Sequence, residues 1–268
     1  MKYKRFTALT LALCLILALA SCTLKPAASW PELLPGKTIV RGDGNVVTEQ
    51  KLALGGVSSF AAAEQPALRL TDLYILSGKA KLVIDPSLER GVTLTGDRNI
   101  LDLVTVTVSD PGDEIRIGVT GKDRRFIPTE LTIAVGLSVA ALSVDGAWEI
   151  DYDCPDVTSC DIKINGAADG DFAFGALESL RVKVNGAGDI KLSGTAERAS
   201  LTVDGVGHIR AFNLTAQAVE VAVNGAGDCE ITAVKTLDAE INGVGEVTYG
   251  GKPEVRKQIN GLGQVKAR

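Results

Sequence analysis

Apolar and polar residues alternate through the second half of the chain, and this alternation predicts a series of short β-strands. Seven Asn or Asp residues, which we call anchors, follow apolar residues five, three and one positions earlier, except that Lys257 stands three positions before the last one. Apolar residues return five and seven positions after most anchors. Because neighbouring side chains of a strand point to opposite faces, each unit presents one apolar inward face. The anchors are Asp145, Asn165, Asn185, Asp204, Asn224, Asn242 and Asn260.

The anchors recur at spacings of 20, 20, 19, 20, 18 and 18 residues, most clearly in the phrase Asn-Gly-Ala-Gly-Asp at residues 185–189 and 224–228. A fixed period of this length indicates stacked supersecondary units. One unit buries too few side chains to offset the entropy of ordering it, so the units must pack on one another. The sequence therefore predicts an all-β, right-handed β-helix or β-solenoid of about 20-residue coils. An antiparallel meander with Asn-Gly hairpin turns is the alternative.

The glycines after each anchor predict a tight corner, because glycine supplies a permissive backbone. In a solenoid the corners stack on one another, and the Asn side chains can form an amide ladder at the inter-strand spacing of about 4.8 Å.

The preceding part of the chain is β-rich but less regular, and Ile100–Leu103 is expected to make one helical turn. The strand expected at Leu131–Val135 leads into the first repeat without a linker. We therefore expect one domain over residues 41–268, with an irregular start and repeats from about residue 140.

The N-terminus predicts secretion and lipid attachment. Three cations, Lys2, Lys4 and Arg5, precede an uncharged run that ends before Ser21 and Cys22. This is the pattern of a signal peptide over residues 1–21. Residues 19–22, Leu-Ala-Ser-Cys, resemble the bacterial lipobox, which implies acylation of Cys22. Residues 22–40 would then form a proline-containing tether.

Charge argues against nucleic acid as a partner. Of 28 Lys and Arg and 33 Asp and Glu, removal of residues 1–21 takes three cations and no acids, which leaves a net charge of −8. The polyanionic backbone of a nucleic acid would be repelled. The expected partners are a membrane, through lipid on Cys22, and an unknown envelope or extracellular protein or glycan.

Three cysteines remain after Cys22. Cys154 and Cys160 lie six residues apart around a proline, so a disulfide between them is possible outside the cytoplasm. Cys160 also occupies an inward position, which argues against the bridge. Cys229 takes an inward position too and is expected to be a buried small hydrophobe.

The corner phrase superficially resembles calcium-binding repeats, but we expect no metal and no cofactor. The acids after the corners supply about one carboxylate per coil, whereas Ca²⁺ takes six to eight oxygens. His208 interrupts their column, and as the single histidine it excludes a histidine-clustered metal site. No helix follows the glycines, as a phosphate loop would require. The acids are Asp169, Asp189, Asp228 and Glu246.

Catalysis is not expected, although some β-solenoids cleave polysaccharides. Sugar grooves usually carry aromatic platforms, and only 12 Phe, Trp and Tyr are spread over the chain. Trp148 and Tyr152, beside Asp151 and Asp153, form the one aromatic pairing and are the candidate ligand contacts. A polysaccharide-binding or polysaccharide-cleaving β-helix is the alternative function.

The chain resembles the head GIN domain family of adhesin-head proteins from bacterial envelopes. The resemblance is carried by residues 186–194, Gly-Ala-Gly-Asp-Ile-Lys-Leu-Ser-Gly, and by residues 245–253, Gly-Glu-Val-Thr-Tyr-Gly-Gly-Lys-Pro. It implies a β-helical fold on a surface-exposed or periplasmic lipoprotein, without catalytic residues to carry over. The expected location is the bacterial cell envelope, at the outer membrane or cell surface. The expected function is a non-enzymatic adhesion or interaction module.

Overall fold

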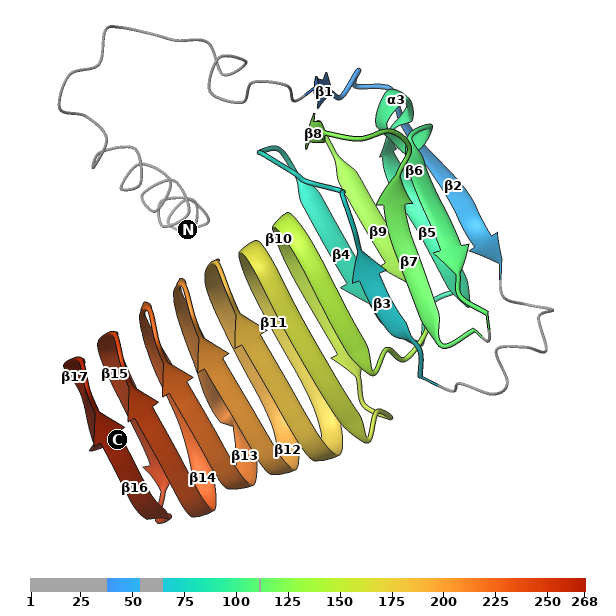
Figure 1. The fold of residues 1–268 in the computed structure, drawn as a ribbon. Helices are drawn as coiled ribbons and strands as arrows, with labels where there is room; N and C mark the ends of the chain where they lie inside the picture. Colours follow the sequence, from blue (N-terminus) through green and yellow to red (C-terminus); the bar gives the residue numbers. More distant parts are fainter. Residues whose placement is uncertain (1–37, 54–64, 111) are drawn as a thin grey trace, which may run out of the picture. The chain divides into compact units, whose positions relative to one another are not determined.

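The computed structural model describes residues 38–53, 65–110 and 112–268, and most of these residues lie in β-strands (Figure 1). The expected signal peptide, Cys22 and most of the tether lie outside the described residues. The strands before the repeats are β1 (Thr38–Arg41), β2 (Val46–Ala53), β3 (Ala67–Leu70), β4 (Ala80–Ile84), β5 (Gly91–Asp97), β6 (Val104–Val108), β7 (Glu114–Val119), β8 (Arg124–Ile127) and β9 (Leu131–Val135).

Parallel stacking of coils forms the second half of the molecule. Neighbouring coils pair in register, so that Asp145 lies beside Asn165 and Asp189 beside Asp169, while Glu246 lies 18 residues after its partner Asp228. All pairings between these strands are parallel, which confirms the β-solenoid and excludes the antiparallel meander. The strands are β10 (Ala141–Cys154), β11 (Ser159–Val184), β12 (Ala187–Val203), β13 (Val206–Val223), β14 (Ala226–Ile241), β15 (Val244–Gly251), β16 (Glu254–Ile259) and β17 (Leu262–Ala267).

The coils next to the repeats do not follow sequence order. Strands β3 and β4 pair in parallel with the two halves of β10, and β7 and β9 pair in parallel with β3 and β4. Strand β9 leads along the chain into β10 without a linker, as expected, but in the sheet β4 lies between these two strands. The alternating burial of Ala80–Ile84 gives β4 the inward face that this position requires.

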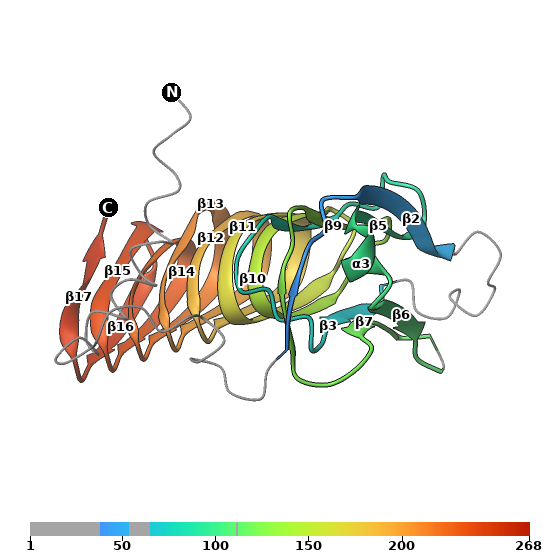
Figure 2. The ribbon, with the colours of Figure 1, turned by 90° about the horizontal axis from the view of Figure 1, so that it is seen from above.

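Antiparallel strands complete the end of the molecule opposite β17 (Figure 2). Strand β5 pairs with β9, β2 pairs with β5, and β6 pairs with β7, all antiparallel. The short helix α3 (Arg98–Leu101) follows β5, two residues earlier than the expected helical turn at Ile100–Leu103. Asp97 is the buried acid at this end, and its carboxylate accepts hydrogen bonds from the backbone N–H groups of Gly44 (2.9 Å) and Thr129 (2.8 Å).

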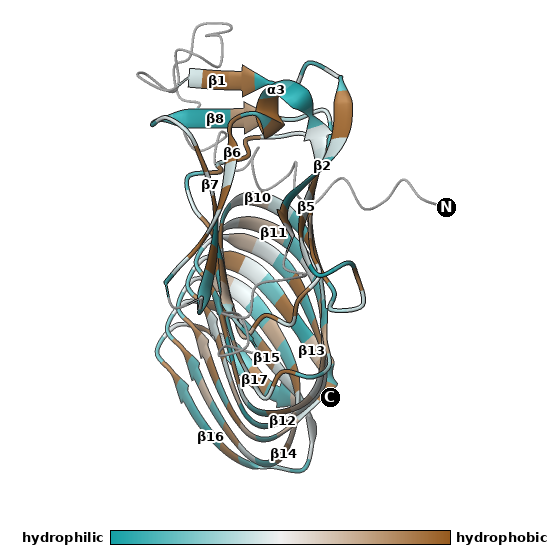
Figure 3. Cartoon of the chain, turned by 90° about the vertical axis from the view of Figure 1, so that its right-hand side faces the viewer, coloured by the Kyte–Doolittle hydropathy of each residue, from teal (hydrophilic) through white to brown (hydrophobic). Residues whose placement is uncertain are grey.

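One hydrophobic core runs inside the coils, and Figure 3 shows hydrophobic and hydrophilic residues alternating along the strands around it. Most inward positions predicted from the repeat are buried, with at most 3% of each residue exposed in the two columns given next, whereas Tyr249 and Ile259 in the last two coils are partly or largely exposed. Each inward residue stacks on its counterpart in the neighbouring coil. One column is Val182, Leu201, Val221 and Ala239, and another is Ile190, Ile209, Cys229 and Val247.

The residue directly after each anchor, which we call the first corner position, must be glycine because no side chain fits there. A Cβ atom built on Gly186 would lie 1.8 Å from the carbonyl oxygen of Gly166, and the equivalent glycine of each later coil meets the coil before it at 1.8 to 2.0 Å. Those carbonyls accept hydrogen bonds from the next coil, as when Val206 N–H donates to Gly186 O at 2.8 Å. Among these glycines only Gly146 has a positive φ, of 101°. The conformational freedom of glycine, which was expected to matter at every corner, is therefore used only at the corner that contains Gly146.

The expected amide ladder is present at the anchors, in two segments. Asn185 Nδ2 donates to Asn165 Oδ1 at 2.7 Å, and Asn165 Nδ2 donates to Asp145 Oδ1 at 2.8 Å. A second ladder begins at Asp204, which accepts from Asn224 at 2.7 Å and continues through Asn242 and Asn260. An ionised carboxylate has no hydrogen to donate, so Asp204 cannot continue the first ladder.

Instead, the Asp204 carboxylate forms an ion pair with Lys183, whose Nζ lies 2.7 Å away. The hydrogen bond from Asn224 and, after it, the Lys183 ammonium lower the pKa of the Asp204 carboxyl.

Substitution of the first corner glycine should destabilise the fold far more than substitution of the second. Gly186→Ala forces a methyl group into the Gly166 carbonyl, and overpacking of this kind costs about 1–3 kcal/mol or more. Gly188→Ala is the matched control, because its Cβ would meet Ala168 O at 3.3 Å. Urea unfolding followed by circular dichroism should show a clear loss for Gly186→Ala and little change for Gly188→Ala. Equal losses would contradict this account of the corner.

Candidate functional site

The outward side chains that follow each corner form a charged surface, which we call the downstream face. Two columns run along it in register. The column nearer the corner is Glu149, Asp169, Asp189, His208, Asp228, Glu246 and Gln264. The second column is Asp151, Asp171, Lys191, Arg210, Glu230, Thr248 and Lys266.

Cations of the second column bridge to acids of the coil before them. Lys191 Nζ lies 2.7 Å from Asp171 Oδ1, and Arg210 Nη1 contacts both carboxylate oxygens of Asp189 at 2.6 and 2.5 Å. These exposed pairs add little stability individually, since exposed ion pairs contribute about 0–1 kcal/mol. Together they set a fixed pattern of charge along the second column, in which two acids are followed by two cations and then by Glu230.

Lys81 of β4 extends this pattern to the irregular end of the molecule. Its ammonium contacts Asp151 at 2.5 Å and Glu149 at 3.1 Å. The hydrogen bond to Asp151 is the main reason that the pKa of Lys81 is raised.

A shallow groove of about 600 Å³ lies along the downstream face. Its charged lining is acidic toward the first coils and mixed toward the last ones. The lining side chains and backbone come from Asp151, Tyr152, Asp153, Asp171, Phe172, Ala173, Lys191, Leu192, Ser193, Arg210, Phe212, Asn213, Glu230 and Arg268.

Phe212 supplies an aromatic ring to the groove because β13 bulges there. The register shifts between Ala211 and Thr215 against β14, so this coil carries extra residues on the downstream side. Phe212 is half-buried, and the Arg268 guanidinium lies 4.6 Å from the centre of its ring. Such a contact is a cation–π interaction. It holds Arg268 over the end of the groove.

Three carboxylates on this face make no ion pair within the described ranges: Asp153, Asp169 and Glu230. Partial burial raises the pKa of the Asp169 carboxyl, and the neighbouring Asp189 carboxylate raises it further. Among residues 38–53, 65–110 and 112–268, no three or more His, Cys, Asp or Glu side chains converge as metal ligands would. His208 is exposed, and its Nδ1 lies 3.3 Å from the carboxylate of Asp228.

Trp148 and Tyr152, the expected ligand contacts, point into the core. They are 4% and 1% exposed, so neither ring can stack on a sugar at the surface. Trp148 Nε1 donates to Asp145 O at 2.9 Å, and the indole replaces the second corner glycine of later coils. The Tyr152 ring packs 5.3 Å from the ring of Phe174, and its hydroxyl donates to Val139 O. The repeat itself places Tyr152 inward, seven residues after its anchor.

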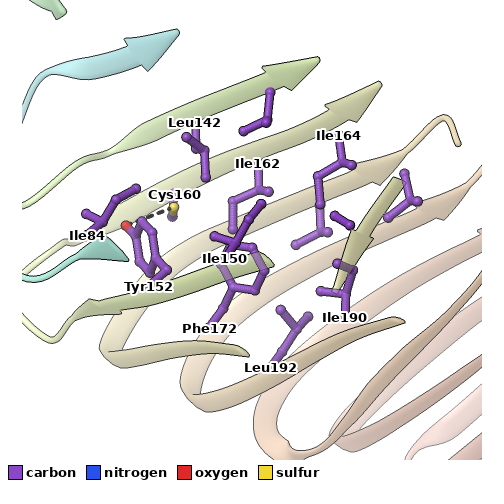
Figure 4. Close-up of a cluster of buried hydrophobic side chains, with 14 of the residues drawn as sticks. Ile84, Leu142, Ile150, Tyr152, Cys160, Ile162, Ile164, Phe172, Ile190 and Leu192 are labelled. Atoms are coloured by element: carbon purple, nitrogen blue, oxygen red, sulfur yellow. Dashed lines mark hydrogen bonds between the residues drawn. The ribbon is translucent and has the colours of Figure 1, made fainter. Parts of the chain in front are cut away.

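The possible disulfide is absent, since Cys154 and Cys160 are free, buried thiols. The Tyr152 hydroxyl contacts Cys160 Sγ at 3.3 Å among the side chains of Figure 4. Burial raises the pKa of the Cys160 thiol to about 12. Cys229 is fully buried, as expected, and burial likewise raises its pKa. These thiols serve as small core residues.

Four residues of the groove were not predicted as site residues from the sequence: Lys191, Arg210, Phe212 and Arg268. Lys191 and Arg210 stand six residues after their anchors, two beyond the acidic column, so aligning outward positions would have found them. No pattern marks Phe212, because its exposure follows from a bulge that interrupts the repeat.

A parallel β-solenoid with a charged open groove defines a class of repeat proteins built to present an extended surface. Residues 75–253 match the family described as "Putative auto-transporter adhesin, head GIN domain". The chain belongs to this family, as its sequence resemblance implies. No curated protein matches the sequence.

Several solved structures share the fold. A protein described as a putative adhesin from Bacteroides fragilis is 24% identical, with a TM-score of 0.67, and the match covers 85% of this chain and 100% of that one. A protein described as a putative lipid-binding protein from Parabacteroides distasonis is 21% identical, with a TM-score of 0.61, over 86% and 100%. A further putative adhesin, from Parabacteroides merdae, is 19% identical with a TM-score of 0.57, over 86% and 99%.

The family and these neighbours carry the names of adhesins and of a lipid-binding protein rather than of enzymes, and they support an adhesion-like module. Such a family indicates a cell-surface or envelope protein. Within the described part of the chain, no helix is long and apolar enough to cross a membrane.

Glu246 gives this face a titration that can be measured. Hydrogen bonds from Lys266, and then from Thr248 and Gln264, lower the pKa of its carboxyl to about 2. Because the folded pKa lies below the unfolded value, the stabilisation holds above about pH 4.5 and is lost as pH falls through about 2. Lys266→Ala should raise the pKa of Glu246 toward 4.5 in a ¹³C NMR titration, whereas Lys252→Ala should leave it unchanged. An unchanged value in Lys266→Ala would contradict the assigned cause.

Proposed function

We propose that this protein is a lipid-anchored, non-enzymatic adhesion module of the bacterial cell envelope, and that it binds an envelope or extracellular partner in the groove of the downstream face. The family supports the adhesive role, and the lipobox-like segment ending at Cys22 supports the anchor. The groove is the observation on which the choice of binding surface rests.

Several features of the groove fit binding rather than a structural role. The fold is held by inward side chains and by the corners, and neither needs charges on the outward face. Asp153 and Glu230 nevertheless line the groove without an ion pair in the described ranges, and Phe212 adds an apolar contact. Cations and carboxylates one coil apart can hydrogen-bond to the hydroxyl, carboxylate or amine groups of a glycan or protein. An extended partner would follow the axis and contact several coils.

Removal of the two groove cations should weaken binding at least tenfold. The purified chain would be tested on an array of bacterial and mucosal glycans and on intact bacterial and epithelial cells, with Lys191→Ala/Arg210→Ala as the groove variant. Lys235→Ala/Lys252→Ala is the matched control, because it removes two exposed cations on neither column of the face. Circular dichroism would establish that both variants fold.

Equal binding by the groove variant and its control would overturn the choice of this face, and binding to none of the surfaces would overturn the adhesive role. Release of sugar reducing ends from the bound polysaccharides would instead favour the polysaccharide-cleaving alternative. The carboxylates beside Lys191 and Arg210 are the groups that such chemistry would use.

The anchor is tested separately at Cys22. The full chain expressed in a bacterium with radiolabelled palmitate should incorporate label and sediment with membranes, and Cys22→Ala should abolish both. Cys14→Ala is the control, since this cysteine lies in the segment expected to be removed. Membrane sedimentation and labelling that survive Cys22→Ala would exclude lipidation at this residue.

A further inference from the structure

A second charged surface lies on the other side of the corners. From each end toward the middle, its charges have opposite signs, with Asp161 before Arg181 at one end and Arg256 before Asp238 at the other. We call the outward side chains that precede the anchors the upstream face, and we number coils 1 to 7 by the anchors Asp145 to Asn260. Coils 2 and 3 carry Asp161, Lys163, Arg181 and Lys183 in this face. Coils 6 and 7 carry Asp238, Glu240, Arg256 and Gln258.

The centre of the face consists mainly of small, uncharged side chains. Coils 4 and 5 contribute Ser200, Thr202, Ala218 and Ala222, with Arg198 and Glu220 as their charged residues. A flat strand surface with small residues at its middle lets a second flat surface approach closely. Glu220 and Lys163 make no ion pair in the part of the chain that the structure describes.

We infer that the upstream face binds a second copy of this chain, related by a twofold axis that lies in the interface, parallel to the strands, between coils 4 and 5. Such a rotation places coil 3 of one copy opposite coil 6 of the other, and coil 2 opposite coil 7. The rotation does not change the position of a residue along its strand. Each column of one copy therefore faces the same column of the other copy, with the coils in reversed order. A twofold interface is self-complementary, and every contact occurs twice.

Each charge on coils 2 and 3 then meets an opposite charge or a polar group. Arg181 faces Asp238 of the second copy, and Lys183 faces its Glu240. Asp161 faces its Arg256, and Lys163 faces its Gln258. No like charges oppose one another across the interface, because Ser200 faces Glu220, Thr202 faces Ala222 and Arg198 faces Ala218.

Other twofold arrangements of this face lack the same complementarity. An axis parallel to the solenoid would place each coil opposite its own copy, so that Arg181 would approach Arg181 and Asp238 would approach Asp238. An axis through coil 4 would place Asp161 opposite Asp238. Like charges facing one another oppose association. The charge order therefore selects the axis between coils 4 and 5.

The available area suits a specific dimer. Strand segments of six residues at about 3.3 Å each, on six coils about 4.8 Å apart, cover about 600 Å² per copy. The total of about 1,200 Å² lies at the lower end of specific interfaces. The key side chains are exposed at the surface, by 69% for Arg181, 53% for Asp161, 85% for Arg256 and 51% for Asp238. The groove on the downstream face stays open in this dimer.

Charge-swap variants test the axis without changing net charge. Arg181 pairs with Asp161 at 3.4 Å within one chain, and Arg256 pairs with Asp238 at 3.4 Å. The first variant, Asp161→Arg/Arg181→Asp, preserves its internal pair but places like charges opposite Asp238 and Arg256 of another copy. The second variant, Asp238→Arg/Arg256→Asp, does the same from the other end. Mixed together, the two variants meet only opposite charges at both ends.

We expect the native full chain to be a dimer by light scattering, with a dissociation constant that rises with salt. Each variant alone should dissociate at least tenfold more readily, and the equimolar mixture should regain the dimer. The control swap on the downstream face, Asp171→Lys/Lys191→Asp, should dimerise like the native chain. Rescue in the mixture also shows that both variants are folded.

Four outcomes would overturn the inference. A native chain that stays monomeric at all concentrations has no such interface, and one that forms longer assemblies lacks a closed twofold. Variants that dimerise as well as the native chain, or a mixture that stays monomeric, would exclude this pairing of coils. Loss of glycan or cell binding by groove variants has no bearing on these results, so the two proposals fail independently.

Discussion

The close contact between corner glycines of neighbouring coils is the constraint on which the rest of the structure depends. Each carbonyl at this position accepts a hydrogen bond from the next coil, and a side chain there would lie within 2.0 Å of that carbonyl. Only glycine allows the coils to approach, so the glycine column fixes the register of the strands that flank each corner. Once the register is fixed, the inward residues must stack, and outward residues are free to vary.

This division explains how much of the fold could be read from the sequence. Period-two alternation marks the inward residues directly, and the recurring Asn-Gly marks the corner, so the solenoid, its core columns and the Asn ladder were predictable. Alternation does not tell which strand lies beside which. The insertion of β4 between β9 and β10 was therefore invisible, because each of these strands has an equally suitable inward face.

The candidate site was less predictable for a related reason. Aromatic composition drew attention to Trp148 and Tyr152, but a large ring in an inward position fills the core, and the first coil has room because its neighbours carry Ala168 and Gly188 there. The groove depends on outward charges that no local rule constrains. Half-buried Phe212 reaches the groove through a bulge, which breaks the periodicity from which the repeat was predicted.

The anchor ladder also limits how such a protein can lengthen by duplication. A duplicated coil that begins with Asn can be inserted between any two others, since its amide both donates to the coil before and accepts from the coil after. A coil that begins with Asp can only accept, so every copy of it starts a new ladder. Lengths in this family should therefore change in steps of one coil, and an Asp anchor such as Asp204 marks the point where a new ladder begins.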